Sequence, residues 1–287
     1  MLPTLTLFGL ALPTYAILMT AGYLAALGVV LSLTAEPRPH APNLERRQVI
    51  DLFIVMLIAS LIGAKLGHVL FEAPGHVLPD GTVVTSVWEL LRHDPWHPFR
   101  LGEGGYVWYG GMLGALGTAA VYFRRRPHLN GLLYADAFAP AVLLGAFLGR
   151  LGCFCSGCCY GIPTDMPWGV IFPATHGQSV HPTQLYDAAV GLIGGGLLWA
   201  WFGRRRFDGQ NLALLLMIYG LARFATEAFR GDPGRGSFGP LSTSQALSIP
   251  VFLAGVGLYR WAARRAASTP AVPGRDPAVA ATLRENA

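Results

Sequence analysis

Seven long apolar segments, joined by short polar stretches, constrain the fold of this 287-residue chain more than any other feature. A helix that crosses a bilayer needs about 20 predominantly apolar residues. Charged residues make up only 13% of the chain, against about 25% in soluble domains. We therefore predict an all-α integral membrane protein with seven transmembrane helices. The segments lie at about residues 12–33, 49–71, 106–123, 133–149, 184–202, 211–229 and 244–262.

The positions of the arginines test this count and orient the chain. Most of the 21 lysines and arginines follow the first, third, fifth and seventh segments. Because basic loops remain in the cytoplasm, we predict an N-terminus outside and a cytoplasmic C-terminus. The clusters are interpreted as topology anchors, so no nucleic-acid partner is expected. They comprise Arg38, Arg46, Arg47, Arg124, Arg125, Arg126, Arg204, Arg205, Arg206, Arg260, Arg264, Arg265, Arg275 and Arg284.

This topology divides the chain into one membrane domain and a tail. Residues 1–265 form the predicted membrane domain, with outer-side loops at 72–105 and 150–183. Val87–Arg92 is predicted as a short amphipathic helix that lies on the membrane. Residues 266–287 are rich in Ala, Pro and Arg, and we expect them to form a disordered cytoplasmic tail.

A polar stripe interrupts the sixth apolar segment. Tyr219, Arg223, Glu227 and Arg230 are spaced four, four and three residues apart, which places them on one face of a helix. Such a face turns toward a cavity or the bundle interior and away from lipid. An intrahelical salt network of its charged members leaves one net positive charge, and Arg150 adds another. We therefore predict an outer-leaflet site for an anion such as a lipid phosphate, which arginine binds bidentately.

Two tyrosines near the predicted outer ends of their helices are further candidates. Tyr15 lies near the start of the first apolar segment, and Tyr109 near the start of the third. Aromatic residues gather at membrane interfaces, so an anchoring role and a site role both fit each of them.

A series of short motifs runs along the chain from about Tyr15 to about Pro250. The stretches are Thr14–Met19, Ile62–Phe71, Gly104–Gly117, Gly149–Gly161, Pro163–Pro173, His181–Tyr186, Arg223–Arg230 and Leu241–Gln245. In this order they resemble the motifs of the prolipoprotein diacylglyceryl transferases, a family of seven-helix enzymes of the bacterial inner membrane. The stretch His181-Pro-Thr-Gln-Leu-Tyr186 is nearly the family's His-Pro-Ser-Gln-Leu-Tyr.

The resemblance implies a reaction and its partners. The family transfers a diacylglyceryl group from phosphatidylglycerol to the lipobox cysteine thiol of a preprolipoprotein signal peptide, and glycerol 1-phosphate leaves. The active site is expected at the outer leaflet, without a cofactor or a metal. The implied catalytic residues are Arg223, Tyr219, Tyr109 and Glu227. The implied substrate-binding residues are Arg150, Tyr15, Gly161, Arg230, His181 and Gln184.

The chain departs from the family pattern at specific positions. The family has His where this chain has Tyr109, and Asn where it has Cys153. Its Asn-Gly-Glu reads Ser156-Gly157-Cys158 here. Because tyrosine, with a reference pKa of about 10, is a poor base near neutral pH, Tyr109 acts by hydrogen bonding, the base lies elsewhere, or the arginines alone activate the thiol.

All four cysteines lie within seven consecutive residues, as Cys153, Cys155, Cys158 and Cys159. An oxidising outer side favours a structural disulfide that involves Cys153 or Cys155. Small buried apolar residues, a metal site and a redox or acyl-carrier thiol are the alternatives. A zinc site usually has two cysteine pairs well apart in sequence, which fits this spacing poorly.

Three other functions therefore remain open beside the transferase. A paralogue with the same lipid donor and another acceptor fits the arginines. A membrane thiol-redox or metal-handling protein fits the cysteines. A lipid-binding protein without catalysis fits the missing histidine.

Overall fold

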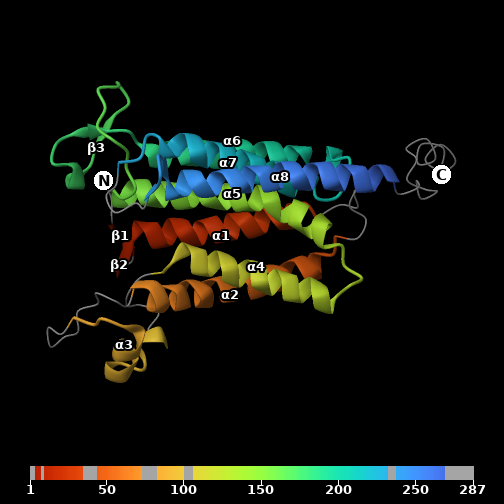
Figure 1. Ribbon diagram of the computed structural model, residues 1–287, viewed down its shortest axis with the longest axis horizontal. Coiled ribbons are helices and arrows are strands. Elements are labelled where there is room, and N and C mark those ends of the chain that lie inside the picture. Colours follow the sequence, from red (N-terminus) through yellow and green to blue (C-terminus); the bar gives the residue numbers. More distant parts are fainter. Residues whose placement is uncertain are drawn as a thin grey trace. The chain divides into compact units, whose positions relative to one another are not determined.

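The computed structural model describes residues 4–7, 10–34, 44–72, 83–99, 106–231 and 237–268. The described residues fall into two compact units. The first combines residues 1–44 with 131–287, and the second comprises residues 45–130. Most of the described chain is helical (Figure 1).

The described residues of the first unit form five long helices and three short antiparallel strand pairs. The helices are α1 (Thr14–Ser32), α5 (Gly131–Ser156), α6 (Thr183–Trp201), α7 (Gln210–Glu227) and α8 (Thr243–Ser268). The strand pairs are β1 (Thr4–Leu7) with β2 (Leu10–Pro13), β3 (Val170–Ile171) with β4 (Ser179–Val180), and β5 (Ser237–Phe238) with β6 (Leu241–Ser242). Two short 3-10 helices, η2 (Pro173–Thr175) and η3 (Phe202–Arg204), complete it.

Glycines let the helices of the first unit approach closely. A Cβ at Gly22 of α1 would lie 3.0 Å from the carbonyl oxygen of Gly145 in α5. One at Gly191 of α6 would lie 2.7 Å from the carbonyl oxygen of Leu143. Small residues of this kind are the usual basis of helix packing in a bilayer. The helices α5, α6, α7 and α8 consequently run side by side (Figure 1).

One arginine of the predicted topology anchors has a different role. Arg205 is 2% exposed, and its Nε lies 3.4 Å from Oδ2 of Asp136 in α5. Asp136 also accepts hydrogen bonds from the backbone N–H groups of Gly209 and Leu212. The interpretation of Arg205 as an anchor is therefore wrong, because its charge is compensated inside the bundle and joins α5 to the start of α7.

The second unit contains α2 (Arg46–Glu72), α3 (Val87–His93), η1 (His97–Phe99) and α4 (Trp108–Arg125). A Cβ on Gly110 of α4 would collide with the carbonyl oxygen of Gly63 in α2, so these two helices pack backbone to backbone. The predicted short helix at Val87–Arg92 is confirmed as α3. Its N-terminus is capped by Ser86, whose hydroxyl accepts a hydrogen bond from the Glu89 backbone N–H.

Each predicted apolar segment contains a helix, but their lengths and compositions differ. Among the described residues, five helices are long and apolar enough to cross a membrane, namely α1, α2, α5, α6 with η3, and α8. The helix α4 contains several glycines and ends in arginines, and α7 carries polar residues at both ends. The architecture is therefore that of a multi-pass, mainly helical membrane protein. The five helices account for five of the seven predicted spans, and the spans assigned to α4 and α7 stay a prediction.

Two boundaries differ from the prediction. The helix α5 continues to Ser156, so Arg150 lies inside a helix and not in the predicted loop that starts there. It ends where Gly157 adopts a positive φ of 71°, a common way to terminate a helix. The helix α8 extends to Ser268, and the remainder of the predicted tail lies outside the described residues.

Candidate functional site

Arg150 and Asp187 form an ion pair between α5 and α6. An Nη atom of Arg150 lies 3.2 Å from Oδ2 of Asp187, and the two side chains are 28% and 11% exposed. The prediction counted the charge of Arg150 as a further uncompensated positive charge, which the structure corrects. The signal was available, because Asp187 is the only charged residue of its apolar segment, and a lone acid in a membrane helix usually has a partner.

A second polar cluster joins the end of α7 to the start of α8. Nη2 of Arg223 lies 2.8 Å from Oε2 of Glu227 and donates a hydrogen bond of 3.0 Å to the hydroxyl of Ser244. The other oxygen of Glu227 accepts a 2.9 Å hydrogen bond from the Ser242 hydroxyl. The predicted contact between Arg223 and Glu227 is therefore confirmed, and two serines from the Leu241–Gln245 motif extend it.

Arg230 lies outside the helix on which the sequence placed it. The helix α7 ends at Glu227, and the backbone of Arg230 forms an antiparallel bridge with Gly161. The prediction of four side chains on one helix face is therefore wrong for Arg230. Its backbone turns away from the helix axis because Ala228 and Phe229 close a turn onto Ala225 and Thr226.

Gly161 lies where three chain segments meet. Its N–H donates a hydrogen bond of 2.8 Å to the carbonyl of His181, and the next N–H, that of Ile162, donates to the carbonyl of Phe229. A Cβ at position 161 would collide with the Phe229 carbonyl oxygen and lie 2.7 Å from the His181 Cβ. The requirement for glycine here is therefore steric, and it brings His181 and Arg230 to the same junction.

His181 belongs to a chain of ring and hydroxyl contacts. Its Nδ1 lies 2.9 Å from the hydroxyl of Tyr186, which also accepts a 2.8 Å hydrogen bond from the indole N–H of Trp168. The imidazole packs against the ring of Phe229 at a centroid distance of 5.1 Å. These contacts fix the loop 157–182 onto the start of α6, so His181 organises the site.

Side chains at the start of α6 also form hydrogen bonds to the turn that contains the cysteines. The amide of Gln184, which is fully buried, donates a 2.6 Å hydrogen bond to the carbonyl of Cys158. The hydroxyl of Thr183 donates a 2.8 Å hydrogen bond to the carbonyl of Cys159. Gln184 thus stabilises the conformation of this turn. Thr183 does the same, although the sequence did not identify it as a site residue.

The turn brings three thiols together beside an arginine. The sulfur atoms of Cys153, Cys158 and Cys159 lie within 4.8 Å of one another, and all four cysteines of the chain are free. Hydrogen bonds with the thiols of Cys153 and Cys158 lower the pKa of the Cys159 thiol, and the charge of Arg230 lowers it further. The cysteines are therefore part of the site region.

The three tyrosines predicted as site residues lie on three different helices. Tyr15 in α1 is 42% exposed, and a ring carbon lies 3.1 Å from the position that a Cβ on Gly152 would take. Tyr219 in α7 is 37% exposed. Tyr109 is 50% exposed at the start of α4, with its ring against that of Trp108. Tyr109 belongs to the second unit and the other predicted site residues to the first, so its part in the site stays a prediction.

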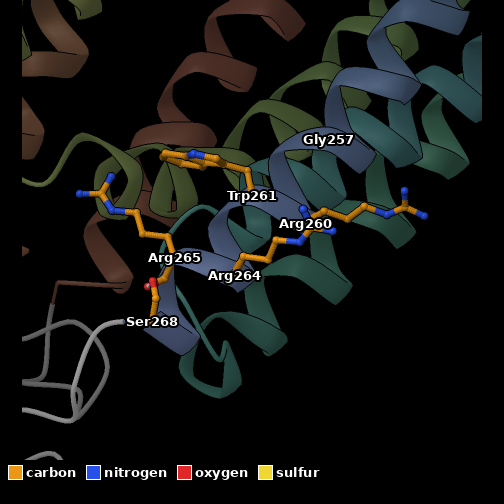
Figure 2. Close-up of a pocket in the computed structure, with 6 residues that line it drawn as sticks. All are labelled: Gly257, Arg260, Trp261, Arg264, Arg265 and Ser268. Atoms are coloured by element: carbon orange, nitrogen blue, oxygen red, sulfur yellow. Dashed lines mark hydrogen bonds between the residues drawn. The ribbon is translucent and has the colours of Figure 1, made fainter.

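A pocket at the opposite end of α8 offers a different environment. It is lined by Gly257, Arg260, Trp261, Arg264, Arg265 and Ser268, whose side chains are drawn in Figure 2. The guanidinium of Arg265 lies over the ring of Trp261 at 5.4 Å. Tryptophan and arginine at a helix end are typical of an interfacial anchor. This pocket shares no residue with the clusters around Arg150 and Arg223.

Similarity to known proteins extends over most of the chain. The prolipoprotein diacylglyceryl transferase family matches residues 3–261. A phosphatidylglycerol–prolipoprotein diacylglyceryl transferase of Bordetella bronchiseptica is 34% identical over 261 residues, which cover 89% of this chain and 92% of the relative. One of Legionella pneumophila (strain Paris) is 36% identical, with coverages of 78% and 82%. One of Nitrosomonas europaea is 34% identical, with coverages of 76% and 75%.

Proposed function

The chain belongs to the prolipoprotein diacylglyceryl transferase family, and we propose on that premise that it performs the first step of lipoprotein maturation. The donor is phosphatidylglycerol, and the acceptor is the cysteine thiol of a prolipoprotein. A bond forms between the sulfur and the terminal carbon of the diacylglyceryl group. The bond from that carbon to the phosphate oxygen breaks, its electron pair stays with the departing glycerol 1-phosphate, and the proton of the thiol passes to that phosphate or to water.

The arrangement around Arg223 is the observation that carries this proposal. The reaction develops negative charge on the departing phosphate, and a fixed cation in a region of low dielectric stabilises such charge strongly. Arg223 is held by Glu227 and Ser244 from two directions, so its orientation is set before substrate arrives. Its positioned guanidinium suits the leaving phosphate or the attacking thiolate.

Arg150 is assigned to the phosphate of the bound lipid. Its ion pair with Asp187 uses one edge of the guanidinium, and the planar group has five N–H donors. Tyr219 and Glu227 orient Arg223, whereas Gly161, His181 and Gln184 shape the loop that faces the substrate. Tyr109 and Tyr15 contribute hydroxyls. The thiolate is stabilised by the arginines, since tyrosine is a poor base near neutral pH.

The proposal includes a location and a topology. We assign the chain to the bacterial inner membrane, with seven spans, an outer N-terminus and a cytoplasmic C-terminus. The regular alternation of arginine clusters supports this orientation. The site then lies at the outer leaflet, where the lipobox cysteine of a signal peptide is presented.

Complementation of a transferase-depleted bacterial strain tests the proposal. We expect the wild-type chain to restore growth and lipoprotein modification, and Arg150→Ala and Arg223→Ala to fail. Arg260→Ala, which removes an arginine at the other end of α8, is the matched control and should rescue. Failure of the wild-type chain despite correct membrane expression would exclude this function. Transfer from phosphatidylglycerol to an acceptor other than a lipobox peptide would favour a paralogous role.

A further inference from the structure

Three of the four cysteine sulfur atoms lie close together at the end of α5. Those of Cys153, Cys158 and Cys159 lie within 4.8 Å of one another. Cys153 is in the last turn of the helix, and the other two follow the residue that ends it. Seven consecutive residues thereby provide three potential metal-ligand atoms that lie close together. The spacing of the cysteines in the sequence did not indicate this arrangement.

The turn that builds this cluster is tightly defined. Gly157 and Cys159 both have positive φ values, 71° and 64°. The N–H of Cys158 donates a hydrogen bond to the carbonyl of Cys153, which folds the chain back over the helix end. A left-handed conformation at a non-glycine residue costs on the order of 1 kcal/mol and persists only where surrounding contacts enforce it. Gln184 and Thr183 provide those contacts from α6.

A positive charge lies beside the three sulfurs. The side chain of Arg230 hydrogen-bonds to the thiol of Cys159. A thiolate is the form of cysteine that binds metal ions. An arginine beside three thiolates also compensates the negative charge that remains when they share a single cation.

We propose that Cys153, Cys158 and Cys159 bind one soft closed-shell metal ion of the class that includes Zn²⁺ and Cu⁺. Thiolate sulfur is the ligand that these ions select. With metal–sulfur bonds of about 2.3 Å, three sulfurs around one ion are spaced by about 4 Å. The three sulfurs of this chain lie within 4.8 Å of one another, which is close to that spacing. The ion would cross-link the end of α5 to the turn that leads to Gly161.

Metal titration of the full-length protein tests this site directly. The chain is purified in detergent, reduced, and freed of metal. Zn²⁺ is then titrated against a chromophoric chelator, and Cu⁺ in a parallel arm against a Cu⁺-specific chelator. We expect one ion per chain in at least one arm. Replacement of Cys153, Cys158 or Cys159 by Ser should weaken binding at least about tenfold, because a ligand is lost.

Cys155 provides the matched control. It lies two residues after Cys153 on the same helix, so it projects to another side. It is also absent from the group of close sulfurs. Cys155→Ser should bind the ion as the wild type does. An equal loss in Cys155→Ser, or no stoichiometric binding by the wild type in either arm, would overturn the proposal.

A measurement on the unaltered chain avoids dependence on the folding of variants. Bound metal should protect three of the four thiols from a thiol reagent, and a chelator should release them. Protection of none or of all four contradicts the site. Mass spectrometry after alkylation without reduction should find no bond between Cys153 and its neighbours, and a quantitative disulfide in protein from native membranes would also overturn it. None of these readouts depends on transferase activity.

Discussion

Glu227 shows how a single carboxylate can position its neighbours in the candidate site. It is 7% exposed, and its two oxygens contact different partners, Arg223 on its own helix and Ser242 of β6, directly before α8. A buried carboxylate in an apolar helix is costly unless both oxygens are satisfied. Glu227 therefore fixes the guanidinium and at the same time ties α7 to α8.

Replacement of Glu227 by Gln should lower transferase activity through Arg223. The amide keeps an oxygen for Ser242 but removes the charge that holds the guanidinium. Because a hydrogen bond to a charged group contributes about 1.5–3 kcal/mol, we expect kcat/KM to fall roughly 10- to 100-fold. The loss should appear in kcat more than in the KM for phosphatidylglycerol. An assay with purified enzyme and a lipobox peptide measures both.

Ser242→Ala is the control for this prediction. It removes the hydrogen bond to the second oxygen of Glu227, together with the one that the Ser242 hydroxyl accepts from the Gln245 backbone N–H, and it leaves the contact with Arg223 in place. We expect a smaller loss than in Glu227→Gln. If the two variants lose activity equally with unchanged melting temperatures, positioning of Arg223 is not the role of Glu227.

At the scale of elements, helix packing depends on which glycines face a neighbour. In α8, a Cβ at Gly255 would lie 2.9 Å from the carbonyl oxygen of Ala213 in α7. A Cβ at Gly257, two residues later, would have nothing within 4 Å. The composition of α8 does not separate these two glycines. Their difference arises from the rotation of the helix against α7.

Gly255→Ala should therefore destabilise the protein, whereas Gly257→Ala should not. An added methyl group in a packed interface costs about 1–3 kcal/mol. In an exposed helix interior, alanine is favoured over glycine by about 1 kcal/mol. Thermal unfolding in detergent should show a lower melting temperature for the first variant and an equal or higher one for the second. Equal melting temperatures would contradict close packing of α7 against α8.

At the scale of the whole molecule, the orientation in the membrane determines which compartment reaches the site. The exposed arginines of α8 mark the end predicted to be cytoplasmic, and the clusters around Arg150 and Arg223 mark the other. Because α7 and α8 form a hairpin, the end of α7 and the start of α8 lie on one side.

Reporter fusions test this orientation. Alkaline phosphatase, which is active only outside the cytoplasm, should be active when inserted after Gly177 and inactive when fused to the C-terminus. A fluorescent protein that folds only in the cytoplasm should show the reverse pattern. Activity of the phosphatase at the C-terminus would contradict the assigned topology and place the arginine clusters on the wrong side.

The class of protein, its family and most residues of the candidate site could be predicted without any coordinates. Apolar segments and arginine clusters are local signals, because bilayer thickness and membrane potential act on each segment separately. The contact between Arg223 and Glu227 was readable for the same reason, since residues four apart on a helix are neighbours.

The partners that come from different parts of the fold could be identified only from the three-dimensional arrangement. Asp187 beside Arg150, Asp136 beside Arg205 and Ser244 beside Arg223 depend on how helices rotate against one another. The three clustered thiols depend on where α5 ends and how the chain turns at Gly157. A lone acid in an apolar segment signals that a partner exists. The identity of that partner depends on helix packing, which no local pattern encodes, and the resulting contacts set the charge and the geometry of the candidate site.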